Sequence, residues 1–151
     1  MENYKITALK PKHLGGIYEI EKQSFAKPWS RESIAGELEN PFAFYLICEG
    51  PDGLVLGYVG VHIILGEGHI TNIAVREGFR RRGIAKSLVS QLVSEAKEMD
   101  LELLTLEVRQ SNAAAHALYE KFGFKVSGQR KAYYEDPRED GDIMTLFFEG
   151  N

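Results

Sequence analysis

The chain has 151 residues, of which 44% are hydrophobic and 26% are charged, and its formal net charge is −4. This length and composition are typical of one globular domain, and we expect residues 1–151 to form a single domain with its own core. The net negative charge disfavours general attraction to polyanions, so we expect no nucleic-acid partner.

Membrane insertion and disulfide bonding are also disfavoured. The longest apolar stretch, "LVLGYVGVHIILG", is shorter than the roughly 20 residues that a membrane span needs, and it contains His62. The first ten residues lack the apolar segment of a signal peptide. Cys48 is the one cysteine and lies in an apolar run, which indicates a buried thiol. We therefore expect a cytoplasmic protein with no membrane partner.

The first half of the chain predicts two helices among three strands. Alternating residues 4–10 predict a strand, and Pro11 opens a helix over residues 11–25. Ser30 is expected to cap a helix that Pro41 ends. Apolar runs at 42–50 and 54–65, separated by a turn at 51–53, predict two further strands.

The second half begins with a predicted strand at 69–75. A helix is expected from about Gly83, because an apolar stripe follows it at helical spacing. The stripe consists of Ile84, Leu88, Val89, Leu92, Ala96 and Met99. A strand at 101–108, a helix capped by Ser111 and closed by Gly123, and two strands at 124–134 and 142–150 complete the chain. The order predicts an α/β (α+β) fold with a mixed sheet and helices on its faces.

The loop between the strand at 69–75 and the helix from Gly83 is the first candidate site. The strand–helix–strand unit is a crossover between parallel strands, and ligands in such sheets bind at the carboxyl ends of strands. The helix N-terminus offers unpaired backbone N–H groups, Gly83 permits close approach, and Arg80 to Arg82 add positive charge. This combination suits a phosphate or pyrophosphate.

The spacing of this loop selects among phosphate ligands. A nucleoside-triphosphate loop would place a lysine and a hydroxyl directly after the second glycine, but Lys86 and Ser87 come two positions too late. The pattern that does match is [QR]-x-x-G-x-[GA], with Arg80, Gly83 and Ala85. At these residues the chain resembles the GNAT superfamily of acetyl-CoA-dependent N-acetyltransferases. The alternative is a basic, solvated turn.

A second candidate site lies in "LLTLEVRQSNAAAHALYEKFGF". Glu107 stands in an apolar strand, where partial desolvation would make its carboxylate a better base, unless it pairs with Arg109 or is solvated. Tyr119 lies on the apolar stripe of a helix, and such a tyrosine, taken by itself, is more often a core residue than a catalyst. His116 lies one position off that stripe and is expected to be exposed.

The run from Leu106 to Phe124, "LEVRxSNxxAxxLYxxxGF", resembles the ribosomal-protein-alanine N-acetyltransferases within GNAT. The resemblance implies a mostly antiparallel seven-stranded sheet with about four helices. It also implies acetyl-CoA as cosubstrate, Glu107 as general base and Tyr119 as general acid. The cofactor-binding residues that it implies are Ile73, Ala74, Val75, Arg80, Arg81, Arg82, Gly83, Ile84, Ala85, Lys86 and Asn112.

The resemblance extends to the acceptor side, where it implies a protein N-terminus as substrate, from a ribosomal protein starting with alanine. The substrate-binding residues expected on this basis are Trp29, Tyr133, Tyr134, Glu139 and Asp140. An acidic loop attracts a cationic partner, but we expect most of its carboxylates to be solvated and only a subset to contact the substrate. The four histidines have no ligand spacing, so we expect no metal. Two alternatives stay open: an acetyltransferase for small amines or lysine side chains, and a CoA-binding regulatory module without turnover.

Overall fold

The structure is a computed structural model that describes residues 3–149. The elements are β1 (Lys5–Ala8), the 3-10 helix η1 (Pro11–His13), α1 (Leu14–Ser24), α2 (Arg31–Glu37), β2 (Ala43–Glu49), β3 (Val55–Ile64), β4 (Glu67–Val75), α3 (Ile84–Glu98), β5 (Leu103–Arg109), α4 (Ala113–Glu120), β6 (Lys125–Tyr134) and β7 (Glu139–Phe147). Within residues 3–149 no helix is long and apolar enough to cross a membrane.

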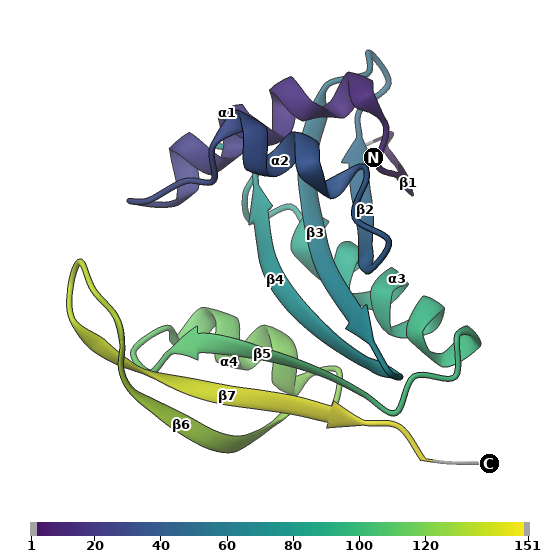
Figure 1. The fold of residues 1–151 in the computed structure, drawn as a ribbon. Helices are drawn as coiled ribbons and strands as arrows, with labels where there is room; N and C mark the ends of the chain where they lie inside the picture. Colours follow the sequence, from purple (N-terminus) through teal and green to yellow (C-terminus); the bar gives the residue numbers. More distant parts are fainter. Residues whose placement is uncertain (1–2, 150–151) are drawn as a thin grey trace.

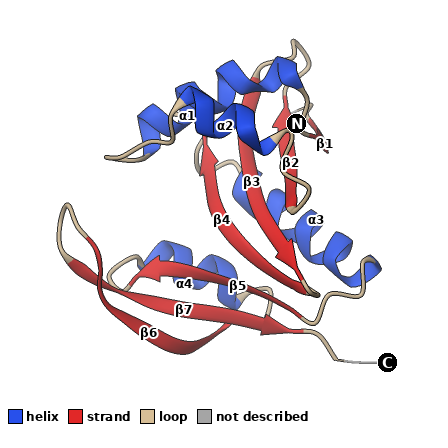
Figure 2. Cartoon of the chain, viewed as in Figure 1, coloured by secondary structure: helices blue, strands red, loops and turns tan. Residues whose placement is uncertain are grey.

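The strands form one seven-stranded sheet in the order β1-β2-β3-β4-β5-β7-β6. Every neighbouring pair is antiparallel except β4 and β5, which α3 connects. The predicted mixed sheet and parallel crossover are therefore confirmed. Figure 1 and Figure 2 show α1 and α2 over one face of the sheet, with α3 and α4 on the other.

The two faces of the sheet each have an apolar core, which β2 illustrates. Leu46 and Cys48 pack into the core beneath α3 and α4, while Tyr45 and Ile47 pack into the core beneath α1 and α2. Because successive strand residues point to opposite faces, a strand covered on both sides becomes a continuous apolar run. The expected burial of Cys48 is confirmed, since its side chain is fully buried.

The parallel pairing of β4 with β5 is short. The ladder joins Glu67, Gly68 and His69 to Leu103, Leu104 and Thr105, and it stops there. Beyond these residues the two strands separate, as Figure 1 shows where β4 and β5 diverge. The sheet is thus split toward the carboxyl ends of both strands, and the edge of β4 that faces β5 is left open.

A β-bulge lies in β4 at the start of this split. Gly60 pairs with Asn72 and Val61 with Ile70, so Thr71 is an extra residue opposite β3. A bulge resets the alternation of side chains, and bulges are over-represented next to functional sites. As a result Ile70 and Ile73 pack toward the α3 core, whereas Asn72 reaches Glu21 on α1.

The helix termini agree with the sequence in two places and differ in two. Ser30 caps α2 by accepting a hydrogen bond from the Ser33 N–H at 3.1 Å, and Gly83 precedes α3, both as predicted. The predicted Ser111 cap is wrong, because the Oδ1 atom of Asn112 accepts from the Ala115 N–H at 3.1 Å. The α2 helix ends at Glu37, before Pro41 is reached.

Candidate active site

A cavity of about 640 Å³ lies at the split between β4 and β5. Its walls come from five segments: the β4 residues 70–73, the β5 residues 106–109, α4 with its cap residue, the segment that connects α1 to α2, and residues 133–136 at the end of β6 and in the turn that follows. Glu107, Tyr119 and Asn112 line it together with Trp29 and Ile73. Residues distant in sequence and predicted separately therefore meet in one cavity.

Glu107 presents its carboxylate at the split. Its side chain is about one-tenth exposed, and the alternating burial of β5 places it on the less buried face, as predicted. Its Oε1 atom lies 2.7 Å from His69 Nε2, and its Oε2 atom lies 3.4 Å from Arg130 Nε. The carboxylate is paired with these two groups and not with Arg109, which the sequence had left open.

Tyr119 is buried, with its ring edge-on to Phe124 at a centroid distance of 5.4 Å. Burial, with a smaller contribution from Tyr134, raises the pKa of Tyr119 above its usual range. The phenol therefore keeps its proton at neutral pH and can act as a donor but not as a base. Tyr119 packs in the core and also lines the cavity, so the expectation of a core residue is confirmed.

Two further tyrosines stand at the end of β6, before the turn to β7. Tyr133 and Tyr134 pack edge-on at 5.0 Å, and Arg109 lies over the Tyr134 ring at 4.5 Å. Burial, followed by the neighbouring Tyr133 and Glu107, raises the pKa of Tyr134 to about 12. Both tyrosines line the cavity and give that wall an apolar surface with polar tips.

The acidic residues in this turn and at the start of β7 divide into two groups. Glu135 and Asp136 line the cavity. Glu139 accepts from the Ser111 N–H at 2.6 Å, and Asp140 accepts from the Ala132 N–H at 2.7 Å. These hydrogen bonds, ahead of nearby cations, lower the pKa of both carboxyl groups. Glu139 and Asp140 thus hold the turn together and lie outside the cavity lining.

Trp29 is anchored by a buried carboxylate. Its backbone N–H donates to Glu21 Oε1 at 2.9 Å, and Glu21 also accepts from the Tyr58 hydroxyl and from Asn72 Nδ2. Glu21 is almost fully buried, so these hydrogen bonds compensate for its desolvation. In the same segment, Lys27 Nζ donates to Glu135 Oε2 at 2.6 Å and connects the α1–α2 segment to the β6–β7 turn.

The N-terminus of α3 has the geometry expected of an anion site. Gly83 lies in the left-handed region at φ 80°, and a Cβ built there would contact nothing within 4 Å. No side chain caps this helix, and its first turn has no acidic residue. Its first N–H groups and the positive end of the helix dipole are therefore directed at the turn.

The three arginines of this turn have different surroundings. Arg80 donates to the Val75 carbonyl at 3.0 Å and to Ser24 Oγ at 3.2 Å, so it connects the turn to β4 and α1. Arg82 lies over the Phe79 ring at 5.1 Å. Arg81 is exposed and has a φ of 64°.

The other residues expected to bind the cofactor lie along one path. Ile73 lines the cavity, Ala74 points into the α1 core, and Val75 ends β4. At the start of α3, Ile84 is buried, Ala85 is half-buried and Lys86 is exposed. The path runs from the open edge of β4 to the N-terminus of α3.

The sequence that forms this fold, the cavity and the helix N-terminus matches a known protein family. The model of the "Acetyltransferase (GNAT) family" matches residues 14–124, which is most of the chain and includes four of the five segments that line the cavity. The chain belongs to this family. It is a GNAT acetyltransferase.

Two curated relatives and one solved structure resemble this acetyltransferase over most of its length. It is 45% identical over 129 residues, 85% of each chain, to a Bacillus subtilis protein provisionally named ribosomal protein bS18-alanine N-acetyltransferase. It is 34% identical over 143 residues to the Escherichia coli enzyme of that name, covering 93% of this chain and 95% of the relative. The crystal structure of the Escherichia coli ribosomal-protein-S18-alanine N-acetyltransferase superposes with a TM-score of 0.91, at 32% identity, covering 99% and 96%.

His116 differs from the prediction made for it. It is half-buried, with Nδ1 at 2.8 Å from the Asn112 carbonyl and Nε2 at 3.0 Å from Asp142 Oδ2. The contact with Asn112, ahead of that with Asp142, raises the pKa of His116. In the acetyltransferase this histidine connects α4 to β7, so the expectation of an exposed side chain is wrong.

Several residues that line the cavity of the acetyltransferase, or contact Glu107 beside it, were not predicted from the sequence. His69 and Arg130 contact Glu107, and Thr71 and Asn72 line the wall formed by β4. The strand at 69–75 was predicted, but its pairing register and its bulge were not. A signal was present in His69, a polar residue in an apolar strand, but its spacing gave no indication of a partner.

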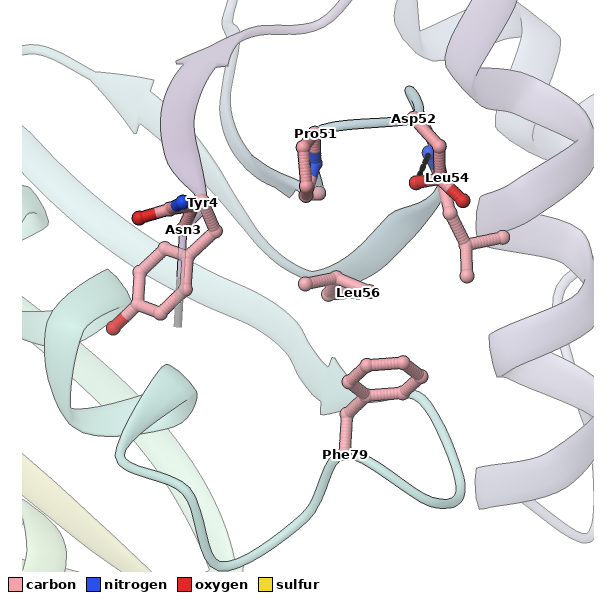
Figure 3. A pocket seen from close by; sticks show the side chains of 8 residues that line it. Asn3, Tyr4, Pro51, Asp52, Leu54, Leu56 and Phe79 are labelled. Carbon is pink, nitrogen blue, oxygen red and sulfur yellow. Dashed lines mark hydrogen bonds between the residues drawn. The ribbon is translucent and has the colours of Figure 1, made fainter. Parts of the chain in front are cut away.

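A second cavity, of about 590 Å³, lies beside the turn before α3 and contains none of the predicted site residues. Figure 3 shows Tyr4, Leu56 and Phe79 around it, with Asp52 accepting a hydrogen bond from the Leu54 N–H. Its lining is mainly apolar, and the Asp52 carboxylate is already hydrogen-bonded to a backbone N–H of its own turn. Among residues 3–149, no three His, Cys, Asp or Glu side chains are placed to hold a metal.

Proposed function

We propose that this acetyltransferase transfers the acetyl group of acetyl-CoA to the α-amino group of a protein chain, and that the acceptor is a ribosomal protein beginning with alanine. The observation that carries the proposal is the meeting of Glu107 and Tyr119 in one cavity at the split of the sheet. The printed names of the relatives support the acceptor class.

Acetyl-CoA fits the residues at the split. The uncapped N-terminus of α3 and the open space at Gly83 suit a pyrophosphate, and the unpaired edge of β4 suits the amide groups of an extended chain. Arg81 and Lys86 add exposed positive charge beside the turn. The bound molecule supplies an activated acetyl group as a thioester.

The acceptor amine is the group on which the protein acts. An α-amino group has a pKa of about 8 and is mostly protonated at pH 7, so it must lose a proton before it can attack. Glu107 takes this proton, directly or through one water molecule. Its Oε2 atom is suited to this, because its contact with Arg130 is long and Arg130 is half-exposed.

Tyr119 then protonates the departing thiolate as the C–S bond breaks, and the proton released by the attacking nitrogen restores the phenol. Its raised pKa keeps the phenol protonated until that step. Backbone N–H groups at the open edge of β4 would stabilise the negative charge that develops on the carbonyl oxygen. The acidic wall of Glu135 and Asp136, with the tyrosine pair, suits a cationic, extended N-terminus.

The test uses a peptide that begins with alanine and contains one internal lysine. With acetyl-CoA, mass spectrometry should place the acetyl group on the terminus, and a peptide with a blocked terminus should give no product. Acetyl-lysine formed on the blocked peptide at a comparable rate would instead support a lysine-directed enzyme. If neither peptide nor any small amine is acetylated while acetyl-CoA binds, the regulatory alternative is correct.

The role of Glu107 is tested with Glu107→Gln, which preserves the shape of the side chain and removes the base. It should lower kcat roughly 10²–10⁴-fold at neutral pH. Acetyl-CoA affinity should change little, since Glu107 is on the face of β5 away from the α3 N-terminus. A near wild-type rate in this variant would refute Glu107 as the base.

A further inference from the structure

His69 lies where β4 and β5 separate. It pairs with Thr105 in the last rung of the β4–β5 ladder, and Glu107 is two residues farther along β5, beyond the ladder. Residues two apart in a strand point to the same face. The imidazole therefore spans the opening of the split, with Nε2 at 2.7 Å from Glu107 Oε1.

The contacts of Glu107 are unequal. The contact with His69 at 2.7 Å is short, whereas that with Arg130 Nε at 3.4 Å is long. The Glu107 carboxylate is about 10% exposed, and the His69 imidazole is 44% exposed. The short contact fixes Oε1, so the orientation of the carboxylate, and the direction in which Oε2 points, depend on His69.

The surroundings of His69 include a second histidine. On β3, His62 is its direct cross-strand partner, so both side chains are on the same face of the sheet. His62 Nε2 lies 2.7 Å from Glu37 Oε1, on α2. The titratable and charged groups that face His69 are therefore His62 from β3 and Glu107 from β5, with Arg130 of β6 beyond Glu107.

We propose that His69 is a positioning residue for the base Glu107, and that protonation of His69 reduces the basicity of that carboxylate. The proposal rests on the proposed function, in which Glu107 takes the proton of the acceptor amine. Neutral His69 donates one hydrogen bond to Oε1 and holds the carboxylate in place. A protonated imidazole adds a full positive charge 2.7 Å from the base and makes it a poorer proton acceptor.

Three variants test the proposal, with kcat measured against pH at saturating peptide and acetyl-CoA. His69→Ala removes the hydrogen bond and should lower kcat roughly 10-fold while acetyl-CoA affinity stays the same. His69→Gln can still donate to Oε1 but cannot ionise. It should restore most of the rate, and its pH profile should lack whatever part of the acid-side fall in kcat comes from a charged imidazole.

His62→Gln is the matched control. It removes a histidine from the same face and the same cross-strand pair, but one that contacts Glu37 and not Glu107. It should leave the shape of the pH profile as in the wild type. Circular dichroism and thermal melting of each variant would separate loss of fold from loss of rate.

The outcomes separate this proposal from the proposed function. If Glu107→Gln is nearly inactive but both His69 variants have wild-type rates and profiles, the positioning role is wrong and the base assignment stands. If Glu107→Gln itself retains its rate, the base assignment fails, and the positioning role fails with it. A His69→Gln profile that keeps the wild-type fall toward acid pH would overturn the charge effect alone.

Discussion

Replacing Gly83 by aspartate is expected to weaken acetyl-CoA binding far more than replacing it by asparagine. Both side chains have nearly the same shape, and both tolerate the left-handed conformation better than most residues, which matters at φ 80°. A Cβ at this position meets no atom within 4 Å, so neither variant is expected to disturb the packing of α3. The difference between the two is the single negative charge at the turn.

The size of that difference follows from Coulomb's law. At about 5 Å from a phosphate charge, one carboxylate costs ~0.8 kcal/mol in a medium like bulk water and ~3 kcal/mol at an effective dielectric constant of 20. Gly83 is exposed, so the true environment lies between these limits. Aspartate should therefore raise Kd roughly 4- to 150-fold relative to asparagine.

Isothermal titration calorimetry of both variants, at low and at high ionic strength, would measure this ratio. The ratio should shrink as salt is added, because exposed charges are screened. Thermal melting provides the control for folding, and the two variants should melt at similar temperatures. Equal affinities of the aspartate and asparagine variants at low salt would show that no anion binds at this turn.

Three further results are expected. Tyr119→Phe should lower kcat roughly 10²–10⁴-fold without lowering the melting temperature, because the ring keeps its contact with Phe124; an unchanged rate would exclude the phenol as the acid. The raised pKa of His116 stabilises the fold at acidic pH, and this contribution is lost as pH rises through the folded-state pKa. His116→Gln should therefore lower the melting temperature at pH 5.5 but not at pH 9. An equal effect at the two pH values would refute the linkage. Gly60→Ala should reduce the free energy of unfolding by about 1–3 kcal/mol, because its Cβ would lie 2.6 Å from the Tyr45 ring. Gly15→Ala should cause no such loss, because a Cβ there meets no atom within 4 Å. Equal stability of the two variants would contradict the packing argument.

The sequence predicted the features that depend on short-range patterns. Gly83 marked the start of α3 because an apolar stripe at helical spacing follows it directly. The alternation of β5 placed Glu107 on the correct face. These features are encoded within ten or so neighbouring residues, so they can be read without knowledge of the rest of the fold.

Features that depend on pairing between distant strands could not be predicted. The contact between His69 and Glu107 requires the register of β4 against β5, which no local pattern specifies. The bulge at Thr71 changes which face Asn72 occupies, although the alternation of the strand gives no sign of it. The Ser111 cap failed for a smaller reason, because serine and asparagine are both good caps and stand side by side.

The short ladder between β4 and β5 also bears on how the molecule unfolds. Only three residue pairs join the β1–β4 part of the sheet to the β5–β7–β6 part, so this junction has few backbone hydrogen bonds to lose. Amide hydrogens there are expected to exchange with solvent through local opening, at a lower free energy than those within either part. A cosubstrate that spans the split would bind both parts at once, and at 100 times its Kd it would add about 2.7 kcal/mol to the stability of the folded chain.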